Sequence, residues 1–104
     1  MICTYRVRSG NEESFTTLLG QHWPTLHRLE AVTDEPATVY KSLDPYEPTF
    51  VEIFTWLHRD PGSPAPSEHP DVLAIWEKME QLCEARDGRP SMEFPHFERL
   101  HLHG

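Results

Sequence analysis

Two histidines of the sequence fall in apolar stripes with helical spacing, a pattern that places an imidazole at the edge of a protein core. His22 follows Leu18 by four residues and precedes Leu26 by four, and His69 precedes Val72 by three. An imidazole so placed can act as a general base or orient a ligand, because it titrates near neutral pH. The structural alternative is two partly buried imidazoles bonded to backbone carbonyls. His22 and His69 are therefore the candidate catalytic residues.

A carboxylate stands in the middle of an apolar segment, where Glu52 lies between Phe50 and Phe54. A buried carboxylate is costly unless donors satisfy it, so we expect Arg, His or backbone N–H partners. Glu52 is either half of a structural ion pair or a substrate-binding carboxylate in a pocket. With His22 and His69 it has the residue types of a two-histidine, one-carboxylate iron site. No spacing forces the three together, so we expect no metal and no cofactor.

Three tryptophans are the side chains best suited to line a pocket for a small aromatic ligand. They are Trp23, Trp56 and Trp76. The structural alternative is that they fill the core, which we expect of at least one of them. We predict a cavity between a sheet and two helices, lined by these tryptophans and both histidines. The proline-rich segment 58–70 can drape over its opening.

The composition excludes several classes of protein. The 104 residues suit a single domain, 1–104, and the net charge of −8 argues against nucleic-acid binding. No apolar run is long enough to span a membrane, and the N-terminus has no signal region. Cys3 and Cys83 cannot build a disulfide framework and fall in apolar stripes as inert thiols. We therefore expect a cytoplasmic protein that binds neither nucleic acid nor membranes.

The chemistry must be positioned by six elements in the order β-α-β-β-α-β. Apolar patterning predicts strands over 2–8, 37–43, 49–57 and 91–103 and helices over 11–29 and 71–86. This order predicts an α+β, ferredoxin-like fold with an antiparallel four-strand sheet and both helices on one face. The first and third strands are then central. Pro24 inside the first helix predicts a bend or a restart near 20–24, and Pro95 predicts an edge position for the last strand.

The third predicted strand is apolar on both faces, because Val51, Ile53 and Leu57 oppose Phe50 and Phe54. Two helices cover only one face of a four-strand sheet, so a monomer would leave the apolar side chains of the other face exposed to solvent. We therefore expect a homodimer in which two sheets pair face to face. The alternative is a twisted monomeric sheet partly covered by its own C-terminal tail.

The chain resembles the antibiotic biosynthesis monooxygenase family of the dimeric α+β barrel superfamily. The resemblance covers nearly the whole chain through element order and length. It is carried by the third strand, Phe50-Val51-Glu52-Ile53-Phe54-Thr55-Trp56, and then by His69-Pro70 and Ala74-Ile75-Trp76. It implies a dimeric α+β barrel and activities that include cofactor-free oxidation of hydroxylated aromatics, quinol oxidation and heme degradation.

One departure from the family concerns asparagine. Heme-degrading and polyketide-oxidising members rely on an active-site Asn, whereas the single asparagine here is Asn11, expected at a helix cap, and the first strand offers Thr4 and Arg6 instead. Catalytic residues are therefore not transferred from either branch. Two functions remain open. One is a cofactor-independent monooxygenase or oxidoreductase for a small aromatic or quinol-like compound. The other is a non-catalytic dimeric module that binds a small hydrophobic ligand.

Overall fold

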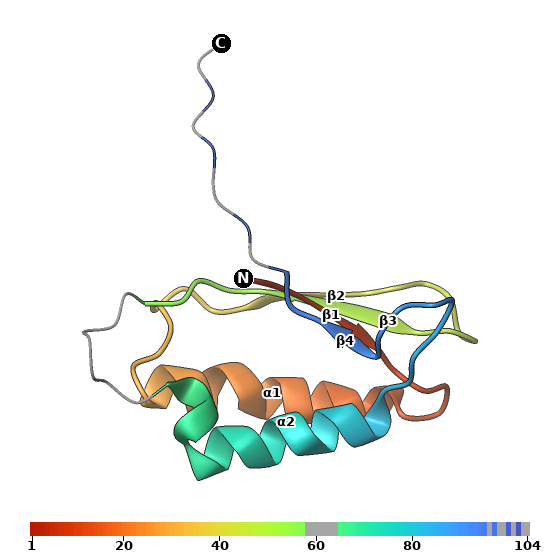
Figure 1. The fold of residues 1–104 in the computed structure, drawn as a ribbon, viewed down its shortest axis with the longest axis horizontal. Helices are drawn as coiled ribbons and strands as arrows, with labels where there is room; N and C mark the ends of the chain where they lie inside the picture. Colours follow the sequence, from red (N-terminus) through yellow and green to blue (C-terminus); the bar gives the residue numbers. More distant parts are fainter. Residues whose placement is uncertain (58–64, 96, 98–99, 101, 103–104) are drawn as a thin grey trace.

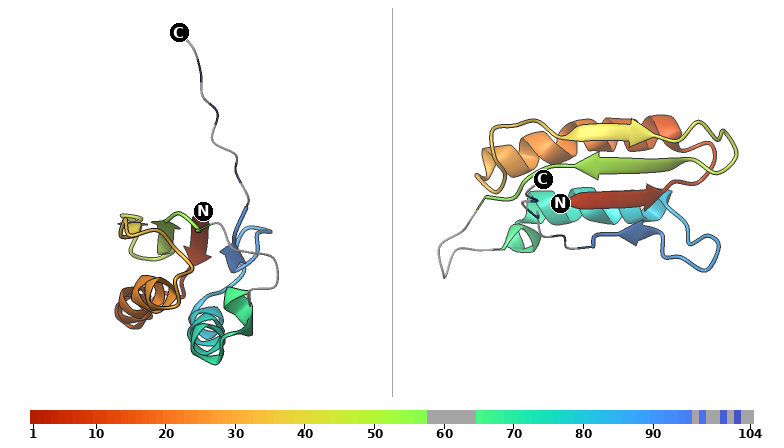
Figure 2. Two further views of the ribbon diagram at one scale, coloured as in Figure 1. Left: turned by 90° about the vertical axis from the view of Figure 1, so that its left-hand side faces the viewer. Right: turned by 90° about the horizontal axis from the view of Figure 1, so that it is seen from above.

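Two layers make up the protein, a four-stranded antiparallel sheet and a pair of helices on one of its faces (Figures 1 and 2). The computed structural model describes residues 1–57, 65–95, 97, 100 and 102. The sheet has the order β2-β3-β1-β4, which is compatible with a ferredoxin-like fold and confirms the predicted α+β class. The elements are β1 Ile2–Arg6, α1 Glu12–Arg28, β2 Thr38–Lys41, β3 Thr49–Ile53, the 3₁₀ helix η1 Pro66–Glu68, α2 Pro70–Leu82 and β4 Met92–Glu93.

The core lies between the helices and the inner face of the sheet. Alternation along β1 turns Cys3 and Tyr5 inward, and Phe50 and Glu52 of β3 lie opposite Tyr5 and Cys3 in the antiparallel register. The helices contribute buried side chains at spacings of three and four, as the sequence predicts. These are Phe15, Leu18, Leu19, His22, Leu26, Val72, Ile75 and Met79.

Helix α1 runs through Pro24 as a single element, so the predicted restart does not occur. Pro24 and Gly20 both lie on the exposed side of the helix. The Gly20 carbonyl, which loses its N–H partner at Pro24, is therefore near solvent rather than in the core.

All four strands are shorter than the sequence predicts, and β3 and β4 differ most from the predicted ranges. Phe54 still pairs with Met1, and after it the chain bonds instead to the segment after α1, where the Thr33 N–H donates to the Thr55 carbonyl. Strand β4 has only two residues and ends before Pro95, which cannot donate to the ladder. Its position at the sheet edge is as expected.

Within the described residues, no helix covers the outer face of the sheet (Figure 2). Val51 is half-buried there, and Ile53 and Leu57 are 38% and 41% exposed. Strand β3 is thus central, as predicted, but is covered on one side only within the described chain. Several apolar side chains near or after the sheet are also exposed, namely Tyr40, Phe94, Phe97, Leu100 and Leu102. Within the described residues, no helix has the length and apolarity to cross a membrane.

Candidate functional site

The inner face of the sheet holds a buried carboxylate with two side-chain donors. The Tyr5 hydroxyl donates to Oε1 of Glu52 at 2.8 Å, and Nδ1 of His22 lies 2.9 Å from Oε1 and 3.1 Å from Oε2. All three side chains are buried. Burial raises the pKa of Tyr5 well above its ordinary value, so its hydroxyl stays protonated and keeps donating. The carboxylate is therefore stabilised by hydrogen bonds rather than by Arg or Lys.

The second ring nitrogen of His22 also has a partner. The indole Nε1 of Trp76 donates to Nε2 of His22 at 2.9 Å. Because an indole N–H can only donate, Nε2 must be the accepting nitrogen. The proton of the neutral ring is then on Nδ1, and this N–H donates a hydrogen bond to Glu52. This chain of contacts assigns the tautomer of His22.

Four elements bring these groups together, and β1 supplies Tyr5. Central strand β3 supplies Glu52 from its inward face, directly opposite Cys3 of β1. Helix α1 supplies His22 from the stripe that includes Leu18 and Leu26, and α2 supplies Trp76 one position beyond buried Ile75. The helix stripes and strand alternation are the features from which the sequence predicted inward orientations for His22 and Glu52.

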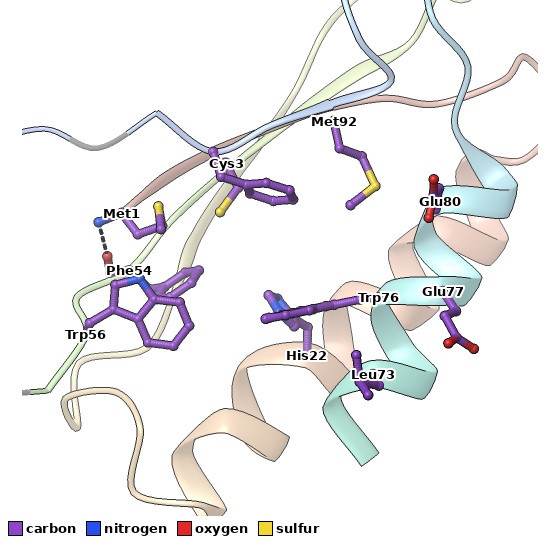
Figure 3. Close-up of a pocket in the computed structure, with 11 residues that line it drawn as sticks. Met1, Cys3, His22, Phe54, Trp56, Leu73, Trp76, Glu77, Glu80 and Met92 are labelled. Atoms are coloured by element: carbon purple, nitrogen blue, oxygen red, sulfur yellow. Dashed lines mark hydrogen bonds between the residues drawn. The ribbon is translucent and has the colours of Figure 1, made fainter. Parts of the chain in front are cut away.

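A cavity of about 440 Å³ lies beside this cluster, between α2 and the inner face of the sheet (Figure 3). This volume falls in the range of sites for small ligands. Aromatic rings form much of its wall, and Phe54 packs edge-on to both Trp56 and His22, with ring centroids 4.9 and 5.9 Å apart. The lining residues are Met1, Cys3, His22, Phe54, Trp56, Leu73, Trp76, Glu77, Glu80, Met92 and Phe94.

Few polar groups reach this cavity. The N-terminal ammonium of Met1 is occupied, because it donates to the Phe54 carbonyl at 2.6 Å (Figure 3). Burial raises the pKa of the Cys3 thiol to about 12, so it is uncharged at neutral pH and is a poor nucleophile. Glu77 and Glu80 stand on α2 at one side of the cavity. Among the lining residues, His22 is the one whose ring is held by a buried carboxylate, an arrangement that suits it to proton transfer.

Three of the predicted cavity residues line it, and two do not. His22, Trp56 and Trp76 are lining residues, and Glu52 lies behind His22 as its partner. His69 occupies the N-cap of α2 with extended backbone, where its carbonyl accepts the Val72 and Leu73 N–H groups. A residue before the first helical turn does not continue the helix stripe, which is why the periodicity misplaced His69.

Trp23 is the second predicted residue that does not line the cavity. It follows His22 by one residue, which turns it about 100° around the helix, and it stacks on His27 at 4.6 Å between ring centroids. Sequence reasoning also missed residues that do take part. Tyr5 is one of them: it lies on the inward face of β1, next to the position opposite Glu52, and its hydroxyl bonds the carboxylate.

Within the described residues, no group of three or more His, Cys, Asp or Glu side chains could hold a metal ion. His22 and Glu52 are in contact, but His69 does not join them. The histidines of the C-terminal tail, His101 and His103, lie outside the described residues, as does most of the proline-rich connection, at 58–64.

No family model, no curated protein and no solved structure matches the chain.

Proposed function

We propose that the protein binds a small hydroxylated aromatic compound in the cavity beside His22, and that His22 is the base that takes the proton of its hydroxyl group. The observation that carries this proposal is the bond between Nδ1–H of His22 and the buried carboxylate of Glu52. A carboxylate on Nδ1 fixes the tautomer whose Nε2 can accept a proton, and it stabilises the imidazolium that forms. The aromatic wall supplies the contact area for a flat, apolar ring.

The reaction we propose is a cofactor-independent oxidation by O₂. His22 takes the hydroxyl proton of the phenolic (enol) tautomer, whose reacting carbon carries one C–H bond, and the resulting anion transfers two electrons to O₂, so that a C–O bond forms at that carbon. The peroxide anion regains the proton from the imidazolium. Cleavage of the O–O bond and of the remaining C–H bond on that carbon then releases water and leaves a carbonyl. An anthrone-like CH₂ thus becomes C=O, and one O₂ is consumed. The apolar part of the wall reduces the contact of the anion with water.

The alternative is a non-catalytic module that binds the same class of ligand. The bond from the Trp76 indole to Nε2 of His22 favours this alternative, because it occupies the nitrogen that a base would use. Both functions predict ligand binding in the cavity. Only the first predicts that bound ligand consumes O₂.

O₂ uptake with anthrone and a panel of hydroquinones, beside binding measured by calorimetry, tests the two functions. His22→Gln removes the base, and His69→Ala is the matched control because His69 lies outside the cavity. We expect the wild type and His69→Ala to bind and turn over a ligand, and His22→Gln to lose turnover. Binding without O₂ uptake would support the binding module. No binding by the wild type would refute both.

We also propose a family and an oligomeric state for the protein. The resemblance to antibiotic biosynthesis monooxygenases agrees with the order of elements and with the aromatic wall formed by Phe54 and Trp56. We also propose that a second copy of the chain covers the outer face of the sheet, which would close a dimeric α+β barrel. The exposed Tyr40 and Ile53, 60% and 38% accessible, support this arrangement. The free cysteines, Cys3 and Cys83, favour a reducing compartment such as the cytoplasm.

A further inference from the structure

Trp76 holds the position on His22 that a ligand would need. Its indole N–H lies 2.9 Å from Nε2, the one ring nitrogen of His22 that does not face Glu52. Nε2 has a single lone pair, so it accepts from one good donor at a time. A ligand hydroxyl can therefore reach this nitrogen only after the indole N–H has left it.

Trp76 also forms part of the cavity wall, where its side chain is half-buried (Figure 3). Its ring meets His22 at an interplanar angle of 62°, with centroids 6.4 Å apart. An aromatic side chain at a partly open wall has room to turn aside when a ligand enters, unlike the fully buried side chain of Tyr5. Trp76 is thus both the hydrogen-bond donor to His22 and a half-buried part of the cavity wall.

We propose that Trp76 is an internal substitute for the ligand, and that the cavity selects aromatic compounds with an O–H or N–H donor. The donor of the ligand replaces the indole N–H on His22, and Trp76 is the positioning residue that controls access to Nε2. This inference rests on the proposed function and narrows its ligand class. Compounds whose only polar atom is an acceptor gain nothing at Nε2, because the nitrogen facing them is itself an acceptor.

Two matched ligands and two matched variants test this inference. 1-Naphthol carries an O–H donor, and quinoline has a similar fused ring with an acceptor nitrogen only. Trp76→Phe retains an aromatic wall but removes the competing N–H. Trp56→Phe is the control, because Trp56 lines the same cavity and makes no hydrogen bond to His22 among the described contacts. Binding is measured by calorimetry, after near-ultraviolet circular dichroism has shown that each variant is folded.

We expect 1-naphthol to bind Trp76→Phe about five- to tenfold more tightly than the wild type, because one competing hydrogen bond has been removed. Quinoline should bind more weakly than 1-naphthol to the wild type and gain little from Trp76→Phe. Trp56→Phe should not tighten either ligand. Equal affinity of the wild type and Trp76→Phe for 1-naphthol would overturn the substitute role of Trp76. Equal affinity of the two ligands would overturn the donor requirement.

A second measurement uses the wild type alone and does not depend on the folding of a variant. Nitrogen-15 NMR of the free protein should show His22 protonated on Nδ1. Addition of 1-naphthol should shift the indole N–H resonance of Trp76 strongly, with little change for Trp23. Binding of 1-naphthol with an unchanged Trp76 N–H would refute only the present inference. Failure of every aromatic ligand to bind would refute the proposed function as well.

Discussion

The imidazole of His22 and the carboxylate of Glu52 meet in the core, with Nδ1 2.9 Å from Oε1, although 30 residues separate them in the sequence. His22 is 3% exposed and Glu52 is fully buried. The pair holds its geometry from two rigid elements, α1 and β3, rather than from loops. An imidazole held in this way has a fixed tautomer before any ligand arrives.

The first prediction concerns the carboxylate. Glu52→Gln retains the shape of the side chain but replaces one acceptor oxygen by an NH₂ donor, so that the hydroxyl of Tyr5 or Nδ1–H of His22 loses its partner. We expect the free energy of unfolding to fall by about 1–3 kcal/mol. Urea denaturation checks this value, and an unchanged midpoint would contradict the bonding described for Glu52.

Tyr5→Phe provides the matched comparison. It removes a donor without leaving a buried donor unpaired, so we expect a smaller loss of about 0.5–1.5 kcal/mol. Because both residues belong to one network, the double variant with Glu52→Gln should cost less than the sum of the single changes. Full additivity in this cycle would show that Tyr5 and Glu52 do not interact.

The second prediction concerns His69, which the sequence placed in the cavity. His69 caps α2 through its backbone, and its side chain makes no capping bond. We therefore expect His69→Ala to change stability by no more than about 0.5 kcal/mol and to leave ligand affinity unaltered. A loss of ligand binding in this variant would show that His69 does contribute to the binding site.

The third prediction concerns Pro24, which lies on the exposed side of an unbroken helix. Pro24→Ala restores an N–H for the Gly20 carbonyl, and we expect stability to rise by about 1–3 kcal/mol. Gly20→Ala is the companion variant: a Cβ there has no neighbour within 4 Å, and alanine should add about 0.5–1 kcal/mol. Thermal denaturation measures both. Destabilisation by Pro24→Ala would mean that the proline is needed for the path of the chain.

Local patterning explains how much of the fold could be predicted. The two-residue alternation of β1 and the stripes of α1 determine which side chains face the core, so Tyr5, His22 and Glu52 could all be placed inward from the sequence. The register between strands is a long-range property. The contact of Glu52 with His22 therefore could not be derived from spacing.

Errors occurred where elements end. The alternating pattern of β3 continues in the sequence beyond the point where the strand ends. At Trp56 the chain pairs with Val32 instead of continuing β3. It also placed His69 in a helix stripe although the helix begins one residue later. The bond from Trp76 to His22 depends on the packing of α1 against α2, which no local pattern specifies.

The fourth prediction is a loss of stability at alkaline pH. Burial raises the pKa of the Cys3 and Cys83 thiols from 9.0 to about 12. The folded protein then retains protons that the unfolded chain releases, so the stabilising contribution is complete below pH 9 and is lost as the pH rises toward 12. Each thiol should lower the free energy of unfolding by up to about 1.4 kcal/mol per pH unit in this range.

Urea denaturation between pH 8 and 10.5 measures this slope. Cys83→Ala is the control, since it removes one titrating thiol and should make the dependence on pH shallower. An equal slope in the wild type and the variant would show that the Cys83 thiol does not contribute.

The last prediction concerns the outer face of the sheet. Val51 lies there between Thr4 of β1 and Tyr40 of β2. If a second copy covers this face, sedimentation should give twice the chain mass of 12.1 kDa. Val51→Lys should then give the single-chain mass, because a lysine ammonium is not desolvated in an apolar interface without a partner. Tyr46→Lys is the control, since Tyr46 is exposed in the turn between β2 and β3 and not on the sheet face.

A wild type that sediments as one chain would refute the dimer. In that case Val51→Lys would test whether the C-terminal tail covers the sheet. A lysine on a covered face should lower the free energy of unfolding, whereas a lysine on a solvent-exposed face should not.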